Sequence, residues 1–229
     1  MGTIGIEWVN KYHGRPGLPN LSNNDENAKG FYNTLHGVRE FQWGDDLAWD
    51  QDFEERYVGA PSAGTDQIWA DNVDICFFSG HGGPSAAFFG VTKYDDGDTK
   101  NTECSLGNRQ LEWIVFDACE VLRWDNGGVF QRWGWPVFKG LHYILGFDTG
   151  TFDSSVRGRK FAERLNAGWT VRSAWIRACQ ETEGSGVRWA YLRAGSGSAN
   201  TYNDHWWGKG NVSPDPYNPS YLAYSRGSC

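Results

Sequence analysis

The sequence lacks the features that mark nucleic-acid-binding, membrane-spanning and disulfide-rich proteins. Its 21 Lys and Arg residues are outnumbered by 28 Asp and Glu, so the formal net charge is −7, and no basic stripe is present. Binding to a phosphate backbone requires clustered positive charge, so we expect no nucleic-acid partner. No apolar run approaches the ~20 residues that span a bilayer, and the first residues do not resemble a signal peptide. We therefore expect no membrane partner and a cytoplasmic, soluble protein.

The cysteines favour a reduced protein without a zinc site. There are five, an odd number, and no two are spaced as CxxC. This pattern predicts neither a disulfide framework nor a zinc knuckle, and it leaves at least one thiol free for chemistry. The acidic stretch 95–98 could offer oxygens to calcium, but it lacks the spacing and terminal Glu of an EF-hand loop. We read that stretch as a solvated turn, and we expect no metal and no cofactor.

The chain is expected to form one α/β domain over residues 1–229. It contains no Pro/Ser-rich linker, and its 36 aromatic side chains (13 Trp, 10 Tyr, 13 Phe) mostly suit a core. Uninterrupted apolar runs at 75–78, 113–116 and 141–147 predict strands of a parallel sheet that are buried on both faces. Apolar spacing predicts helices at 24–35, 47–57, 156–165 and 171–178, with further strands at 38–43 and 187–195. Asn24 or Asp25 and Thr170 are the expected caps of the first and last helices, and Gly168 is expected to follow the end of the third. The predicted fold is a three-layer sandwich with a mainly parallel sheet and helices on both faces.

Two side chains that could take part in catalysis follow two of the predicted central strands, and these strands could be neighbours in the sheet. The first run ends in SGHGG, which contains His81, and the second ends in DACE, which contains Cys119. Ligands of open α/β sheets bind beyond the carboxyl ends of the strands, where both side chains are expected. A thiol becomes a nucleophile when an imidazole accepts its proton. The backbone N–H groups of Gly82 and Cys119 could then form an oxyanion hole.

These two blocks resemble those of the caspase-like (clan CD) cysteine peptidases. ICFFSGHGG is similar to the metacaspase histidine block, and WIVFDACE is similar to the legumain cysteine block. Residues 145–178 resemble, more weakly, the segment that follows the cysteine in separase-like CHAT domains. The resemblance implies a caspase-like fold with a catalytic His81–Cys119 pair. It also implies that Asp117 lines a pocket for a basic or amide-bearing side chain, although the bulky Val121–Leu122 pair departs from the small residue and glycine usual there.

Other residues are expected to contact substrate from the same end of the sheet. Glu120 follows the nucleophile, and Asp148 and Asp153 follow the third apolar run, with helix capping as the alternative role of Asp153. Trp206 and Trp207 belong to an aromatic loop that either frames the cleft or covers the sheet edge.

The sequence supports three functional hypotheses. The first is a hydrolase that cleaves an amide bond through a Cys119 thioester, acting on a peptide or a small-molecule acyl substrate. In the second, an amine or internal group takes the acyl group from Cys119, which makes the protein a transferase, ligase or cyclase. The third is a non-catalytic binding domain of the same fold.

Overall fold

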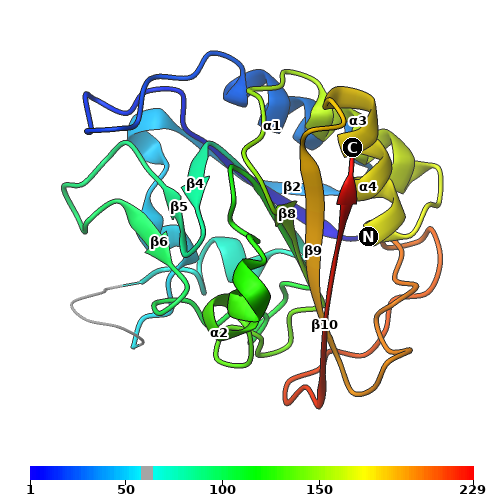
Figure 1. Ribbon diagram of the computed structural model, residues 1–229. Helices are drawn as coiled ribbons and strands as arrows, with labels where there is room; N and C mark the ends of the chain where they lie inside the picture. Colours follow the sequence, from blue (N-terminus) through cyan, green and yellow to red (C-terminus); the bar gives the residue numbers. More distant parts are fainter. Residues whose placement is uncertain (58–63) are drawn as a thin grey trace.

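A seven-stranded sheet runs through the protein (Figure 1). The computed structural model describes residues 1–57 and 64–229. From one edge to the other, the strands are β10 (Tyr221–Ser228), β9 (Arg188–Gly195), β8 (Tyr143–Phe147), β7 (Trp113–Asp117), β3 (Ile75–Ser79), β1 (Thr3–Trp8) and β2 (Val38–Gly44). Strands β8, β7, β3, β1 and β2 are parallel, whereas β9 is antiparallel to both of its neighbours. The prediction of a mainly parallel sheet in an α/β fold is confirmed.

Strands β3 and β7 are apolar up to their last residues, Ser79 and Asp117, because both of their faces are covered. All residues of β3 and β7 are buried. Cys76 and Phe78 point into one hydrophobic cluster, whereas Ile75 and Phe77 point into the other. Successive side chains of a strand point to opposite faces, so a strand with two covered faces needs no polar position.

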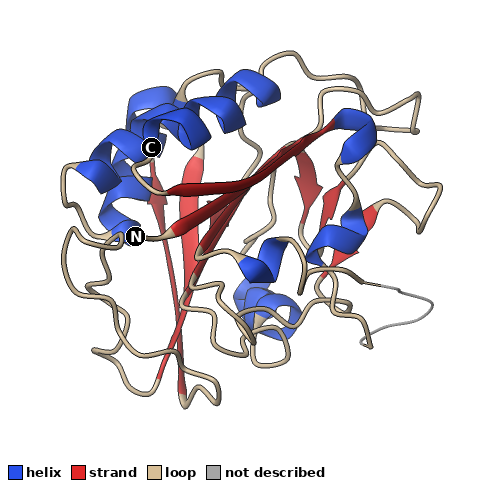
Figure 2. Ribbon diagram, turned by 180° about the vertical axis from the view of Figure 1, so that it is seen from behind, coloured by secondary structure: helices blue, strands red, loops and turns tan. Residues whose placement is uncertain are grey.

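Three helices cover one face of the sheet. They are α1 (Asn24–Thr34), α3 (Arg157–Asn166) and α4 (Val171–Thr182), which lie together in Figures 1 and 2. At the contact between α1 and α3, any Cβ at Gly158 would overlap the carbonyl oxygen of Asn27. The close approach of the two helices therefore depends on that glycine.

The opposite face carries shorter elements. A small antiparallel sheet consists of β4 (His81–Gly83), β5 (Ala86–Phe88) and β6 (Asp98–Lys100), and next to it lie helix α2 (Gly128–Trp133) and the 3-10 turns η1 (Asp45–Leu47), η2 (Asp50–Phe53), η3 (Ala70–Asn72) and η4 (Asp125–Gly127). Phe53 of η2, Ala87 of β5 and Trp133 of α2 belong to the same hydrophobic cluster under the sheet. In the described residues this layer contains the short helix α2 and 3-10 turns, whereas three longer α-helices cover the other face.

The predicted helix over 47–57 is wrong. Residues 45–47 and 50–53 form η1 and η2, and residues after 57 lie outside the described part until 64. Asp50 and Asp52 turn inwards to accept hydrogen bonds from the Gly97 N–H (2.7 Å) and the Thr65 hydroxyl (2.9 Å). Asp50 and Asp52 are two residues apart, and both need hydrogen-bond donors from inside the protein. Short turns provide this arrangement more readily than one continuous helix.

Most other predicted elements are confirmed, with one correction at a helix start. Gly168 follows α3 with a positive φ of 82°, and the Thr170 hydroxyl accepts a hydrogen bond from the Ser173 N–H. Helix α1, however, begins after Asn23, and neither Asn24 nor Asp25 caps it. No helix in the described residues is long and apolar enough to cross a membrane.

Candidate functional site

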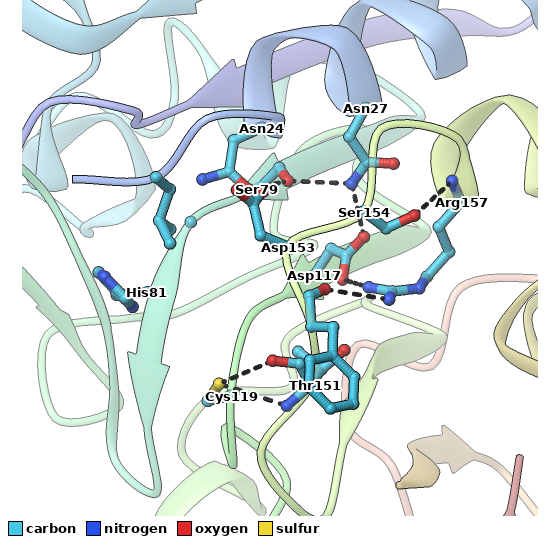
Figure 3. A pocket seen from close by; sticks show the side chains of 13 residues that line it. Asn24, Asn27, Ser79, His81, Asp117, Cys119, Thr151, Asp153, Ser154 and Arg157 are labelled. Atoms are coloured by element: carbon cyan, nitrogen blue, oxygen red, sulfur yellow. Dashed lines mark hydrogen bonds and ion pairs between the residues drawn. The ribbon is translucent and has the colours of Figure 1, made fainter. Parts of the chain in front are cut away.

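A small polar pocket of about 60 Å³ lies beyond the carboxyl ends of β1, β3, β7 and β8. Both His81 and Cys119 line it (Figure 3). Ser79 of β3 pairs with Asp117 of β7, and the Gly80 N–H extends the pairing by donating to the Asp117 carbonyl (3.2 Å). The two strands therefore deliver the histidine and the cysteine to the same place, as the sequence predicts.

Two neighbours hold the ring of His81. Its Nε2 lies 2.8 Å from the carbonyl oxygen of Pro19, which can only accept a hydrogen bond. Nε2 therefore carries the proton, and in the neutral ring Nδ1 keeps the lone pair. The Tyr12 ring packs 4.7 Å from the imidazole, and its hydroxyl accepts the His81 backbone N–H (2.6 Å). This tautomer leaves Nδ1 as the basic nitrogen.

The Cys119 thiol contacts the backbone of Thr151. The Thr151 N–H donates to Sγ (3.4 Å), and the thiol points back to the Thr151 carbonyl (3.6 Å). Burial raises the pKa of the Cys119 thiol above its usual value, and this outweighs the lowering effect of the Thr151 N–H. The resting thiol is therefore protonated at neutral pH. In the described chain, no hydrogen bond joins it to His81.

The backbone around Cys119 is closely packed and strained. A Cβ at Gly82 would lie 2.8 Å from the Ala118 Cβ and 3.1 Å from the Cys119 carbonyl oxygen. Glycine therefore lets β4 rest directly against the cysteine loop. Glu120, the residue after the thiol, has a φ of 59°, a left-handed conformation that costs about 1 kcal/mol or more for a side chain of this kind.

The buried carboxylate of Asp117 already has a cationic partner. It is paired with Arg157 at the start of α3, and it accepts a hydrogen bond from Asn27 Nδ2 (2.7 Å) (Figure 3). Arg157, itself fully buried, also pairs with Glu183. Asp117 thus forms part of the pocket wall, and Arg157 already balances its charge. A basic substrate group would have to compete with Arg157 for the Asp117 carboxylate.

The comparison with known families covers almost the whole structure. Residues 6–227 match a family model described as a domain of unknown function, DUF6345. The chain belongs to the DUF6345 family. No curated protein matches the sequence significantly. The matched region runs from β1 into β10, so the DUF6345 domain includes both His81 and Cys119 together with all four strand ends that form the pocket.

Amide and hydroxyl groups form another wall of the DUF6345 pocket. Asn27 Nδ2 donates to the Ser79 hydroxyl (3.0 Å), which donates in turn to Asn24 Oδ1 (2.9 Å). Asp153 also lines the pocket, and its carboxylate accepts the backbone N–H groups of Ser22 (2.8 Å) and Asn23. Asp153 therefore lies in the pocket wall, where a substrate contact is expected, and ties the loop after β8 to the residues before α1. It does not cap α3, whose N-cap residue is Val156.

Four expected substrate contacts lie elsewhere. Glu120 turns to Arg123 (2.9 Å) and does not line the pocket of the DUF6345 domain. Asp148 is buried between Arg188 of β9 (2.5 Å) and Arg226 of β10 (2.9 Å), so it clamps the antiparallel edge of the sheet. Trp206 and Trp207 lie against Gly2, at the amino end of β1 and opposite to the pocket.

One group of acidic side chains in the DUF6345 domain has the spacing of a cation site. Oxygens of Asp50, Asp95 and Asp96 lie within 4.8 Å of one another. Lys100 pairs with Asp96, and Gly97 donates to Asp50, so part of the negative charge is already balanced. We assign no metal there.

Sequence reasoning missed several residues that shape the site. Tyr12 and Pro19 stand in the loop after β1, which contains no recognisable motif, so only the structure reveals their contact with His81. For Arg157, the sequence does contain an indication that a carboxylate lies close by. A cation in the first turn of a helix faces the positive end of the helix dipole, which is unfavourable unless a carboxylate lies close by.

Proposed function

We propose that this protein is a cysteine-dependent hydrolase that cleaves an amide bond through a thioester on Cys119, with His81 as the proton acceptor. One observation carries the proposal. Cys119 and His81, delivered by adjacent strands, line the same polar pocket, and Pro19 holds the imidazole with Nδ1 free to act as a base.

The raised pKa of Cys119 favours proton transfer during attack over a standing thiolate. Nδ1 of His81 takes the thiol proton as Sγ bonds to the substrate carbonyl carbon. The backbone N–H of Cys119 stabilises the oxyanion, whereas Gly82, the other expected donor, packs against the cysteine loop and does not line the pocket. His81 then returns the proton to the leaving amine, which gives the thioester. Water, deprotonated by His81, attacks the thioester and releases the acid and the thiol.

The pocket wall favours a substrate with a small, neutral, hydrogen-bonding side chain. The cavity of about 60 Å³ presents the amides of Asn24 and Asn27 and the hydroxyl of Ser79. Asn27 Nδ2 and the Ser79 hydroxyl already donate within the wall, so a substrate group would use the second N–H of Asn24 Nδ2 and the remaining lone pairs of the wall oxygens. Because Arg157 already neutralises Asp117, an amide-bearing group fits the wall better than a basic one.

The decisive experiment screens a fluorogenic peptide library that varies the residue before the scissile bond. We expect turnover of amide-bearing substrates that Cys119→Ala and His81→Ala each reduce at least about a hundredfold, the scale of a lost general base. Cys229→Ser and His36→Ala are the matched controls, since neither side chain lines the pocket, and both should retain activity. Full activity of Cys119→Ala would rule out the thioester.

The same screen separates the two other functional hypotheses. Turnover that appears only when hydroxylamine or another amine is added would show that the acyl group is transferred to an amine and not to water. If neither condition gives turnover, and an acyl-reactive inhibitor does not modify Cys119, the domain binds its ligand without chemistry.

A further inference from the structure

A second cavity, lined by aromatic rings, opens on the face of the sheet that carries the small β-sheet. It has a volume of about 130 Å³, and its walls are Trp43 of β2, Trp49 between η1 and η2, and Trp69 ahead of η3. Leu47 stands at the edge with 59% of its surface exposed, and Asp52 of η2 completes the lining. None of these residues lines the pocket of Cys119.

The indole rings are arranged as walls and are held in place. The rings of Trp43 and Trp69 are perpendicular, at 90°, with centroids 5.2 Å apart. Trp49 packs against Tyr94 (4.4 Å), and its Nε1–H donates to the Asp46 carbonyl (2.9 Å). Because this polar edge is already bonded, Trp49 is fixed in its orientation. The cavity is therefore formed before any ligand enters.

A buried negative charge lies beside these rings. Asp52 is 2% exposed, and Thr65 is its hydroxyl donor. The carboxyl group of Glu7 on β1 is fully buried beside Asp52, and burial raises the pKa of Glu7 well above its usual value, so Glu7 is neutral and Asp52 carries the charge. Among the described lining residues there is no Lys or Arg. The cavity thus combines electron-rich ring faces with a carboxylate that has no cation in the lining, and this combination attracts a positively charged guest.

We propose that this cavity, which we call the tryptophan cage (Trp43, Leu47, Trp49, Asp52 and Trp69), binds the trimethylammonium group of a small choline-like molecule. A primary ammonium has three N–H donors that each require an acceptor, and the cage offers only Asp52. A quaternary ammonium has no donor and loses little hydration, so it gains from ring faces alone. The small volume and the acidic Asp45 and Asp46 nearby favour a compact cation without a carboxylate of its own.

The test is binding of choline to the whole chain, measured by calorimetry and by saturation-transfer NMR on the ligand methyl signal. The matched ligand is 3,3-dimethyl-1-butanol, which has the same shape without the charge. We expect choline and tetramethylammonium to bind and the neutral alcohol to bind at least tenfold more weakly. Equal binding of the alcohol would show that only apolar shape is read, and would overturn the proposal.

Variants locate the site. Trp43→Leu and Asp52→Asn should each weaken choline binding about tenfold, the scale of one cation–π or charge contact. Trp135→Leu is the control, because Trp135 is 49% exposed and does not line the cage. Trp43→Leu keeps the test valid if Asp52→Asn does not fold. Unchanged binding in a folded Trp43→Leu would place the ligand elsewhere.

A third comparison identifies which kind of molecule supplies the trimethylammonium group. We expect choline to bind at least as tightly as a peptide that carries trimethyllysine, and more tightly than glycine betaine, whose carboxylate faces Asp52. Tighter binding of the peptide by tenfold or more would overturn the small-molecule assignment. Because the cage and the Cys119 pocket share no residue, choline binding should be the same in Cys119→Ala.

Discussion

At the scale of single residues, the thiols of this protein differ in burial and in pKa. Burial raises the pKa of Cys119, whereas a hydrogen bond from Cys179 lowers the pKa of the half-buried Cys229 to about 7. Cys76, Cys104 and Cys179 are buried. A thiolate is the reactive form, so exposure and thiolate content together select the site of alkylation. Cys119, the proposed nucleophile, is therefore not the thiol that reacts fastest when no substrate is bound.

This difference predicts an order of alkylation. With iodoacetamide at pH 7, Cys229 should be modified before Cys119, and its rate should reach half of its maximum near pH 7. The rate at Cys119 should still rise above pH 8, because its thiolate forms only at higher pH. Peptide mass spectrometry at several pH values measures both rates, and Cys229→Ser isolates the slower one. Fast labelling of Cys119 at pH 6 would contradict the protonated resting thiol.

The residues that the sequence located are those that end a continuous apolar run. His81 and Cys119 can be located from the sequence because they follow the apolar runs of β3 and β7, and the pairing of these two strands brings both residues together. Asp148 occupies an equivalent position after β8, but its carboxylate forms salt bridges with two arginines, one from β9 and one from β10. Those arginines lie 40 and 78 residues further along the chain. No local pattern could reveal such a partner.

At the scale of elements, one buried arginine connects three of them. Arg157 begins α3, Asp117 ends β7, and Glu183 follows α4. All three side chains are removed from water, so the charges depend on each other. Removing one partner of such a group leaves an uncompensated buried charge, which costs about 3–5 kcal/mol.

Replacement of Arg157 should therefore destabilise the whole fold. We expect Arg157→Met to lower the free energy of unfolding by about 3–5 kcal/mol in urea denaturation. Arg159→Met is the matched control two residues along the same helix, since its pair with Glu163 is exposed and such pairs contribute about 0.3–0.5 kcal/mol. Adding Asp117→Asn to Arg157→Met should recover part of the loss. Equal losses in the two single variants would show that the buried group adds nothing.

The elements that sequence patterns missed carry polar residues where the pattern expects apolar ones. Strand β1 lies between β2 and β3 and has Glu7 completely buried, which breaks the apolar run that identifies a central strand. Strand β10 is an edge strand with no buried residue, so it has no periodicity to detect. The turn η2 replaces part of the helix predicted over 47–57 for the related reason that Asp50 and Asp52 face inwards. A periodic pattern of apolar residues reveals a buried strand or helix only when the buried side chains are themselves apolar.

At the scale of the whole molecule, several buried acids hold their protons to a higher pH than they would in the unfolded chain. Burial is the main cause in each case, and it raises the pKa of Asp50 and Asp52 to about 6, Asp71 to about 7, Asp66 to about 8 and Glu54 to about 9. In the unfolded chain these groups titrate near pH ~4. Between these limits the folded state holds more protons than the unfolded state, so stability falls as pH rises.

We therefore expect the protein to be more stable at pH 5 than at pH 8. Acids whose pKa is lowered act in the other direction, and Glu181, at about 2 because of its hydrogen bond from Arg164, favours the folded state less as pH falls below ~4. The maximum should thus lie in mild acid. Thermal unfolding at pH 5, 6.5 and 8, at constant ionic strength, measures it. Glu54→Gln should flatten the slope, whereas the exposed Glu40→Gln should not. An unfolding temperature that rises steadily towards pH 8 would contradict the inference that the folded state holds more protons than the unfolded state.

The pocket of Cys119 also has a consequence for how the protein is made. Its lining and the support of His81 draw on residues from Pro19 to Arg157, contributed by four separate strand ends. A chain emerging from the ribosome cannot assemble the pocket until α3 has left the exit tunnel and packed against α1. Shorter nascent chains carry the thiol but neither the Thr151 backbone nor the Arg157 ion pair. The proposed enzyme therefore has no assembled site until most of the domain has been synthesised, although Cys119 is already present in the nascent chain.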